Sequence, residues 1–198
     1  MTPNQEADAD LIKRFGPDVL VVAAGSEVQR PDIPGIDLSH VKLATEALMN
    51  QKTIKEPILI ADGGLVGCEV AVYFGSEGKK VTLVEMLSEV AFDLDAVSRL
   101  ELLEMLKENN ISILKETHVV DIKKEQLKVR RNGAERSIDA KTFIIAMSMR
   151  PRREIFGEFA HLAPASIAVG DCATPGKIGD AIHDGANKTL NLSTVSQW

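Results

Sequence analysis

The stretch from residue 58 to residue 85 constrains the fold more than any other part of the chain. It contains, in order, the apolar run Ile58–Ala61, the turn Asp62-Gly63-Gly64, a helical pattern over Leu65–Phe74 that ends near Gly75–Gly78, and a second apolar run, Lys80–Glu85. A strand, a helix and a second strand within about 30 residues form a β-α-β unit. The sequence therefore predicts an α/β fold built on a parallel sheet.

The turn of this unit approximates the G-x-G-x-x-G fingerprint of dinucleotide-binding domains of the Rossmann type. In that fingerprint the second glycine lets the backbone approach a pyrophosphate, and the third permits close packing of helix on strand. Gly64 and Gly67 fill those positions and Gly63 lies between the first two, whereas Asp62 replaces the first glycine. We therefore predict a dinucleotide site at Gly63, Gly64 and Gly67, in which the negative charge of Asp62 opposes binding.

Glu85 ends the second strand, 23 positions after Asp62. A carboxylate there can accept hydrogen bonds from the adenine ribose hydroxyls and repels a 2′-phosphate, so NAD is expected rather than NADP. An alternative remains open at this point. Gly63-Gly64 would then be only a strand-to-helix turn, and Glu85 a solvated strand end.

Segments on both sides of this unit extend the fold. Buried strands are expected at 18–24, where the apolar run suggests cover on both faces, and at 111–114, 143–146 and 166–169; helices are expected at 43–50, 95–109 and 177–192. Between residues 117 and 145 short two-sided segments flank Asn132-Gly133, a strong tight-turn signal. The fold class is thus α/β, a Rossmann-type βαβ parallel sheet with an antiparallel β-meander, and a loop region is expected after Arg150-Pro151, as far as Pro164.

Composition narrows the partners and the compartment. The 198 residues carry a net charge of −6, which gives no support for binding nucleic acid or an anionic membrane surface. Neither Cys68 and Cys172 nor the scattered histidines have metal-ligand spacing, so no metal site is predicted. Cys68 is expected to be a packed small residue. The polar amino terminus and the lack of a long apolar run make the cytoplasm the expected location.

Several separated motifs together resemble one family. They are PDVLVVAAGS (17–26), RPDIPGID (30–37), GGLVGCEVAVYFGSEGKKVTLVEML (63–87), DLDAVSRLELLEML (93–106), MRP (149–151) and SIAVGDCATPGKIGDAIHDGANK (166–188). This set resembles the carboxy-terminal region of the NADH:flavin oxidoreductases related to 2,4-dienoyl-CoA reductase, 2-enoate reductase and trimethylamine dehydrogenase. The resemblance implies that electrons pass from a nicotinamide to FAD.

The resemblance also implies a domain plan and further site residues. Residues 54–148 would be an inserted NAD(P)-binding domain, and 1–53 and 149–198 two pieces of a partial FAD-binding domain. Asp171, after Gly170, matches the aspartate that holds the FAD ribityl or pyrophosphate region, and Glu69 matches a glutamate near the nicotinamide amide. Gly25 lies in the segment that corresponds to the family's ATG motif.

The chain departs from the family in informative ways. Ala24 stands where Thr is usual in the ATG motif, and Ser148 where a Gly is expected. The barrel, the cluster cysteines and the first FAD fingerprint do not occur, so FAD is expected in a full-length parent and not in this chain, which would lack the parent's N-terminal portion. No catalytic residue is assigned.

Two functions from different classes follow. The first is a nucleotide-binding fragment of a flavin-dependent NAD(P)H oxidoreductase, whose parent transfers hydride from NADH to FAD. The alternative is a catalytically silent Rossmann scaffold or dimerisation module. The sheet edges at 18–24 and 166–169 favour a homodimer, because unpaired strand edges tend to be covered.

Overall fold

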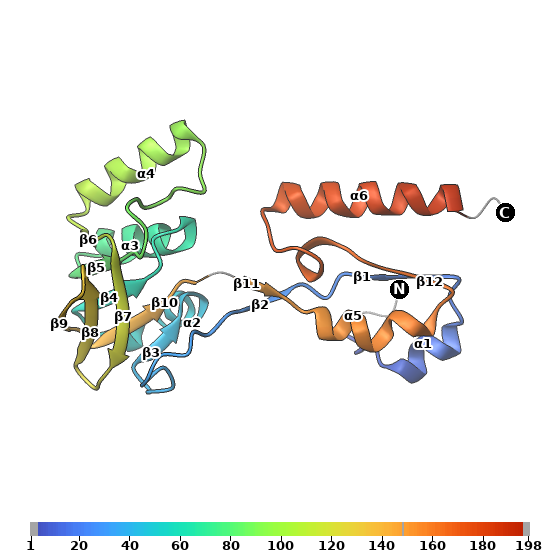
Figure 1. The fold of residues 1–198 in the computed structure, drawn as a ribbon, viewed down its shortest axis with the longest axis horizontal. Coiled ribbons are helices and arrows are strands. Elements are labelled where there is room, and N and C mark those ends of the chain that lie inside the picture. The colour runs from blue at the N-terminus through green and yellow to red at the C-terminus, as the bar shows by residue number, and fades with distance from the viewer. Residues whose placement is uncertain (1–3, 148, 196–198) are drawn as a thin grey trace. The chain divides into compact units, whose positions relative to one another are not determined.

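The structure is a computed structural model that describes residues 4–147 and 149–195. Its residues form two units that are described separately: unit 1 combines the segments 1–29 and 149–198, and unit 2 is the segment 30–148 (Figure 1). The boundary expected at residues 53 and 54 lies inside unit 2. The reason is that the strand at residues 41–43 pairs with a strand of the central sheet of this unit.

A five-stranded sheet forms the centre of unit 2. Its strand order is β3 (Val41–Leu43), β10 (Thr142–Ile145), β4 (Ile58–Ala61), β5 (Val81–Val84) and β6 (Ser112–Leu114), and every pairing is parallel. Helix α3 (Leu65–Ser76) connects β4 to β5, which lie side by side. The βαβ unit and the Rossmann-type parallel sheet predicted from the sequence are therefore confirmed.

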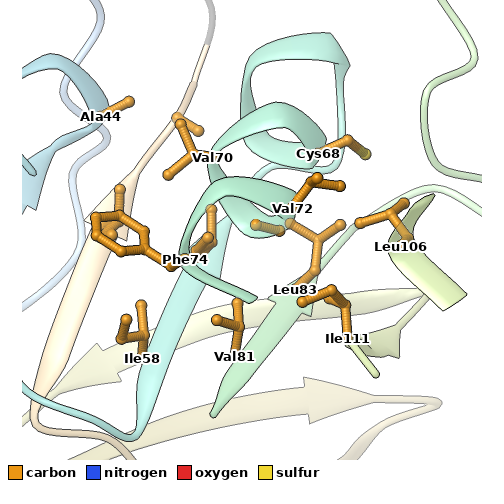
Figure 2. Close-up of a cluster of buried hydrophobic side chains, with 14 of the residues drawn as sticks. Ala44, Ile58, Cys68, Val70, Val72, Phe74, Val81, Leu83, Leu106 and Ile111 are labelled. Atoms are coloured by element: carbon orange, nitrogen blue, oxygen red, sulfur yellow. The ribbon is translucent and has the colours of Figure 1, made fainter. Parts of the chain in front are cut away.

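Helices cover one face of this sheet. Side chains of α2 (Ala44–Met49), α3 and α4 (Ala96–Glu108) pack with alternate residues of the strands, such as Ile58 and Ile60 of β4 and Leu83 of β5. Figure 2 shows Ile58 and Leu83 in this core. Residues on a strand alternate between its two faces. This core is closed by Phe74 and Leu106, both fully buried.

The predicted antiparallel meander is also present, and it lies against the other face of the sheet (Figure 1). It consists of β7 (Thr117–Ile122), β8 (Gln126–Arg131) and β9 (Ala134–Asp139). The intervening residues of the sheet, including Leu59 and Phe143, pack there with Leu127 of β8. A short 3₁₀ turn, η1 (Gln51–Thr53), completes the elements of unit 2.

Unit 1 has two small sheets. Strand β1 (Val19–Val22) pairs in parallel with β12 (Ala165–Ala168), and β2 (Ser26–Val28) pairs antiparallel with β11 (Met149–Pro151). The remaining elements of the unit are α1 (Ala9–Phe15), α5 (Arg153–Phe159), η2 (Ala160–Leu162), η3 (Gly170–Cys172) and α6 (Ile178–Val195).

Two expectations about unit 1 were wrong. The region from Arg150 to Pro164, expected to be a loop, contains α5 and η2. The strand at 18–24, expected to be covered on both faces, leaves Val19 41% and Val21 43% exposed. Val19 and Val21 lie on the same face of β1, so within the described residues this face lacks the second layer that an apolar run suggests.

None of the helices in the described part of the chain combines the length and the apolar character needed to cross a membrane.

Candidate functional site

The glycine turn lies at the carboxyl end of β4, where α3 begins. Asp62 adopts a left-handed backbone (φ 84°), and Gly64 is the N-cap of α3. A Cβ on Gly67 would lie 1.8 Å from the Asp62 carbonyl oxygen. Helix and strand end therefore approach so closely that only glycine fits at position 67, the geometry for which a third fingerprint glycine is used.

Glu85 is held beneath this turn by two hydrogen bonds from backbone amides. The Gly63 amide donates to Glu85 Oε2 at 2.6 Å, and the Leu87 amide donates to Oε1 at 2.7 Å. The side chain is buried, with 4% of the residue exposed. Each carboxylate oxygen has a second lone pair, so Glu85 retains acceptor capacity although its position is set by the turn.

Asp62 also binds the turn. Its Oδ1 accepts a hydrogen bond from the Gly64 amide at 2.8 Å. Burial raises the pKa of Asp62 above its usual value, and the nearby charges of Glu85 and Asp93 act in the same direction, while the bond from Gly64 opposes the rise. The turn is thus surrounded by carboxylates, of which sequence reasoning missed Asp93. The one signal in the sequence is that Asp93 follows β5, the strand whose end lies next to the turn.

The first turn of α3 supplies the opposite polarity. The first backbone bond of the helix runs from the Cys68 amide to the Gly64 carbonyl at 3.0 Å. The amides of Leu65, Val66 and Gly67 precede it, so they have no acceptor within the helix. These amides and the helix dipole favour an anion at this end.

Two further residues of α3 were considered from the sequence. Cys68 is fully buried, and its Sγ lies 3.2 Å from the Gly63 carbonyl, to which it donates. Burial, above all, raises the pKa of this thiol to about 12. The thiol therefore stays protonated at neutral pH and is a packed group, not a nucleophile. Glu69 is exposed on the helix.

The remaining predicted residues lie in unit 1. Gly25 (φ 74°) and Gly170 (φ 60°) both have left-handed backbones. Asp171 accepts from the Ser26 hydroxyl at 3.2 Å through Oδ2, and from the Gly176 amide at 3.2 Å through Oδ1. The structure therefore brings Asp171 beside the Gly25-Ser26 segment. Ser148 lies outside the described residues.

Sequence reasoning missed the group that holds the Gly170 turn. The Gly170 amide donates to Asp184 Oδ2 at 2.8 Å, and Lys188 pairs with Asp184 at 2.9 Å. These two bonds, that from Lys188 first, lower the pKa of Asp184. Both residues lie on α6 one helical turn apart, a spacing that alone does not identify a partner.

Whether the turn suits a dinucleotide depends on the charge and on the space that it offers to a pyrophosphate. The amides at the start of α3 lack an acceptor within the helix and suit a pyrophosphate. A Cβ on Gly64 would meet no backbone, only Asp62 Oδ1 at 3.2 Å and Asp93 Oδ1 at 4.0 Å. The turn therefore has room for the group, whereas the carboxylates of Asp62 and Asp93 lie against its charge. Fold and site together define a dinucleotide-binding domain of the Rossmann type.

The chain belongs to the pyridine nucleotide-disulphide oxidoreductase family, whose model matches residues 13–169. It is 30% identical to cinnamate reductase of Clostridium sporogenes over 85% of this chain and 25% of that protein. It is 31% identical to NADH oxidase of Thermoanaerobacter brockii, over 90% of this chain and 28% of the relative.

Among solved structures, that of 2-naphthoyl-CoA reductase in complex with 2-naphthoyl-CoA superimposes with a TM-score of 0.83 at 28% identity. The match covers 92% of this chain and 28% of that one. The chain thus spans between a quarter and a third of the length of these relatives.

Proposed function

We propose that this chain is the nucleotide-binding portion of a flavin-dependent NAD(P)H oxidoreductase of the enoate or dienoyl-CoA reductase type. The observation that carries the proposal is the glycine turn, where Gly67 lets α3 begin directly against the end of β4. The first amides of α3 have no acceptor within the helix. The names of two similar proteins, cinnamate reductase and 2-naphthoyl-CoA reductase, support the type.

In this proposal unit 2 binds NADH. The amides at the start of α3 bind the pyrophosphate, Glu85 accepts the adenine ribose hydroxyls, and exposed Glu69 lies toward the nicotinamide amide. A bound NADH would supply the hydride that FAD would accept in the parent enzyme. Unit 1, through Gly25, Gly170 and Asp171, contributes part of the FAD site of that parent.

The test is calorimetric titration of the chain with NADH and with NADPH. We expect saturable NADH binding that is weakened at least tenfold by Gly64→Ala, because the added methyl blocks the approach of the phosphate to the backbone. The backbone at position 64 suits alanine, since its φ is −67°. The nearest atom to a Cβ is Asp62 Oδ1 at 3.2 Å, a side-chain atom that has to shift by a few tenths of an ångström. Gly157→Ala, on α5 with open space around it, is the matched control and leaves binding unchanged.

The competing function, a silent scaffold or dimerisation module, is favoured by the carboxylates that crowd the turn. It predicts no heat at millimolar NADH. Tighter binding of NADPH than of NADH would instead contradict the role given to Glu85.

A further inference from the structure

Asp62 occupies the glycine turn itself. It replaces the first fingerprint glycine, adopts the left-handed backbone that position requires, and folds its carboxylate onto the Gly64 amide at 2.8 Å. We propose that Asp62 is a built-in anion that competes with a dinucleotide phosphate for the Gly64 amide. This inference rests on the proposed function and names the group that limits the affinity of the same site.

The contact is local and preorganised. Asp tolerates a left-handed backbone better than most residues do, and its side chain readily bonds an amide two positions ahead. Ordering the Asp62 side chain therefore needs no other element to move. A dinucleotide has to break this bond, which joins a charged acceptor to a backbone donor at the N-cap of α3.

Both glycine amides of the turn are already used by carboxylates. Gly63 donates to Glu85 at 2.6 Å, and Gly64 donates to Asp62. The first bond lies beneath the turn, where Glu85 is buried, whereas the second engages the glycine at which the backbone should approach a phosphate. Asp62 and not Glu85 is thus the acid that a ligand meets as a competitor.

The charges around Asp62 disfavour the ionised form of its carboxyl group. Glu85 faces it from the end of β5, and Asp93 from the segment that follows, while Cys68 on α3 is a neutral thiol. Arg99 of α4 is ion-paired with Glu89 at 2.7 Å. The Asp62 carboxylate is therefore held in an acidic setting by its bond to Gly64, and a phosphate that takes its place at this amide meets the same negative charges of Glu85 and Asp93.

The test compares Asp62→Gly with Asp62→Asn in calorimetric titrations with NADH. Asparagine keeps the left-handed backbone and an oxygen for the Gly64 amide but removes the charge. Glycine also keeps the left-handed backbone, but it removes both the charge and the side-chain oxygen. We expect Asp62→Gly to bind NADH at least tenfold more tightly than the unaltered chain, and Asp62→Asn to recover only part of that gain. Asp32→Asn, the same change at an exposed position of unit 2, is the control and leaves affinity unchanged.

Two results would overturn the proposal while the site itself stands. Equal gains in both variants would mean that charge alone weakens binding and that the Gly64 amide is not contested. NADH binding by the unaltered chain with no gain in Asp62→Gly would mean that the side chain does not compete at all.

If no variant binds NADH, the proposed function fails. The inference about Asp62 is then tested by NMR, by following the resonance of the Gly64 amide while inorganic pyrophosphate is added. A shift of this resonance in Asp62→Gly that is absent from the unaltered chain supports competition for the amide. No shift in either protein overturns it.

Discussion

Asp62 carries a carboxyl whose charged form is disfavoured by the folded chain, because burial raises its pKa. A group whose folded pKa is raised contributes stability below its unfolded pKa and loses that contribution as pH rises through the folded pKa. Asp62→Asn removes this loss and keeps the acceptor for Gly64. We therefore expect the variant to unfold at higher urea concentration than the unaltered chain at pH 7, as measured by circular dichroism.

The difference between the two proteins should shrink as pH falls through the folded pKa of Asp62, since both are then neutral at this position. Asp32→Asn provides the control for a general loss of negative charge. A midpoint for Asp62→Asn below that of the unaltered chain at pH 7 would mean that the charged bond to Gly64 outweighs the cost of burial.

Gly67 is the second residue on which the turn depends. Gly67→Ala would place a methyl 1.8 Å from the Asp62 carbonyl oxygen. This oxygen belongs to the backbone, so the clash is relieved only if α3 or the end of β4 shifts. We expect a loss of about 3 kcal/mol or more in the free energy of unfolding, measured with urea. Gly157→Ala, a helical glycine with nothing within 4 Å of the added methyl, should change stability by about 1 kcal/mol or less and in the favourable direction. Equal effects of the two substitutions would contradict the close approach at position 67.

At the scale of an element, α4 presents one face to the core and another to solvent. Leu106 is 1% exposed and packs against the central sheet, whereas Leu100 is 60% exposed (Figure 2 shows Leu106). Leu106→Ala should cost about 2–5 kcal/mol, because burial is lost and a cavity remains. Leu100→Ala on the same helix should change stability by less than about 0.5 kcal/mol. Chemical denaturation of both variants tests the orientation of the helix, which would be wrong if Leu100 were the costlier position.

How well each element could be predicted depended on its length and on how far it is buried. Strand β4 has the predicted bounds Ile58–Ala61 because all four residues are buried between two layers, so that its sequence is a continuous apolar run. Helix α5 was missed because none of its described residues is buried and it follows directly on Pro151, which suggested a loop. The three-residue strands β2, β3 and β11 are too short to show a period.

The candidate site was predicted only in part for a related reason. Glycine spacing and the strand-end acid are local patterns, so Gly63, Gly64, Gly67 and Glu85 could be placed near one turn. The bond from Gly64 to Asp62 and the proximity of Asp93 depend on a left-handed backbone and on the course of the segment after β5. Neither has a periodic signature in sequence.

At the scale of the whole molecule, the two units differ in how much they bury. Among the described residues, the buried apolar side chains of unit 1 are Ile12, Val22, Val169 and Cys172, whereas unit 2 has two extensive clusters. Segments with few buried apolar contacts open more readily. Hydrogen exchange followed by mass spectrometry should therefore show faster exchange in β1 and β12 than in β4, β5 and β10. A homodimer through the β1 face would reverse this order at high protein concentration, and sedimentation would detect it.

The final prediction concerns flavin. In unit 1 the groups proposed for an FAD site already have partners, since Asp171 accepts from Ser26 and Gly176 and the Gly170 amide donates to Asp184. Within the described residues, the glycine turn that opens an α-helix directly at the end of a parallel strand lies in unit 2, at Gly63–Gly67, whereas Gly170 after β12 opens only the 3₁₀ turn η3. The few groups that unit 1 can offer would not give a flexible dinucleotide enough favourable contacts to offset the entropy that it loses on binding. We expect the purified chain to lack the visible absorbance of flavin and to show no NADH-oxidising turnover with artificial acceptors, even where calorimetry detects NADH. One flavin per chain after purification would contradict this prediction and show that unit 1 holds FAD without further protein.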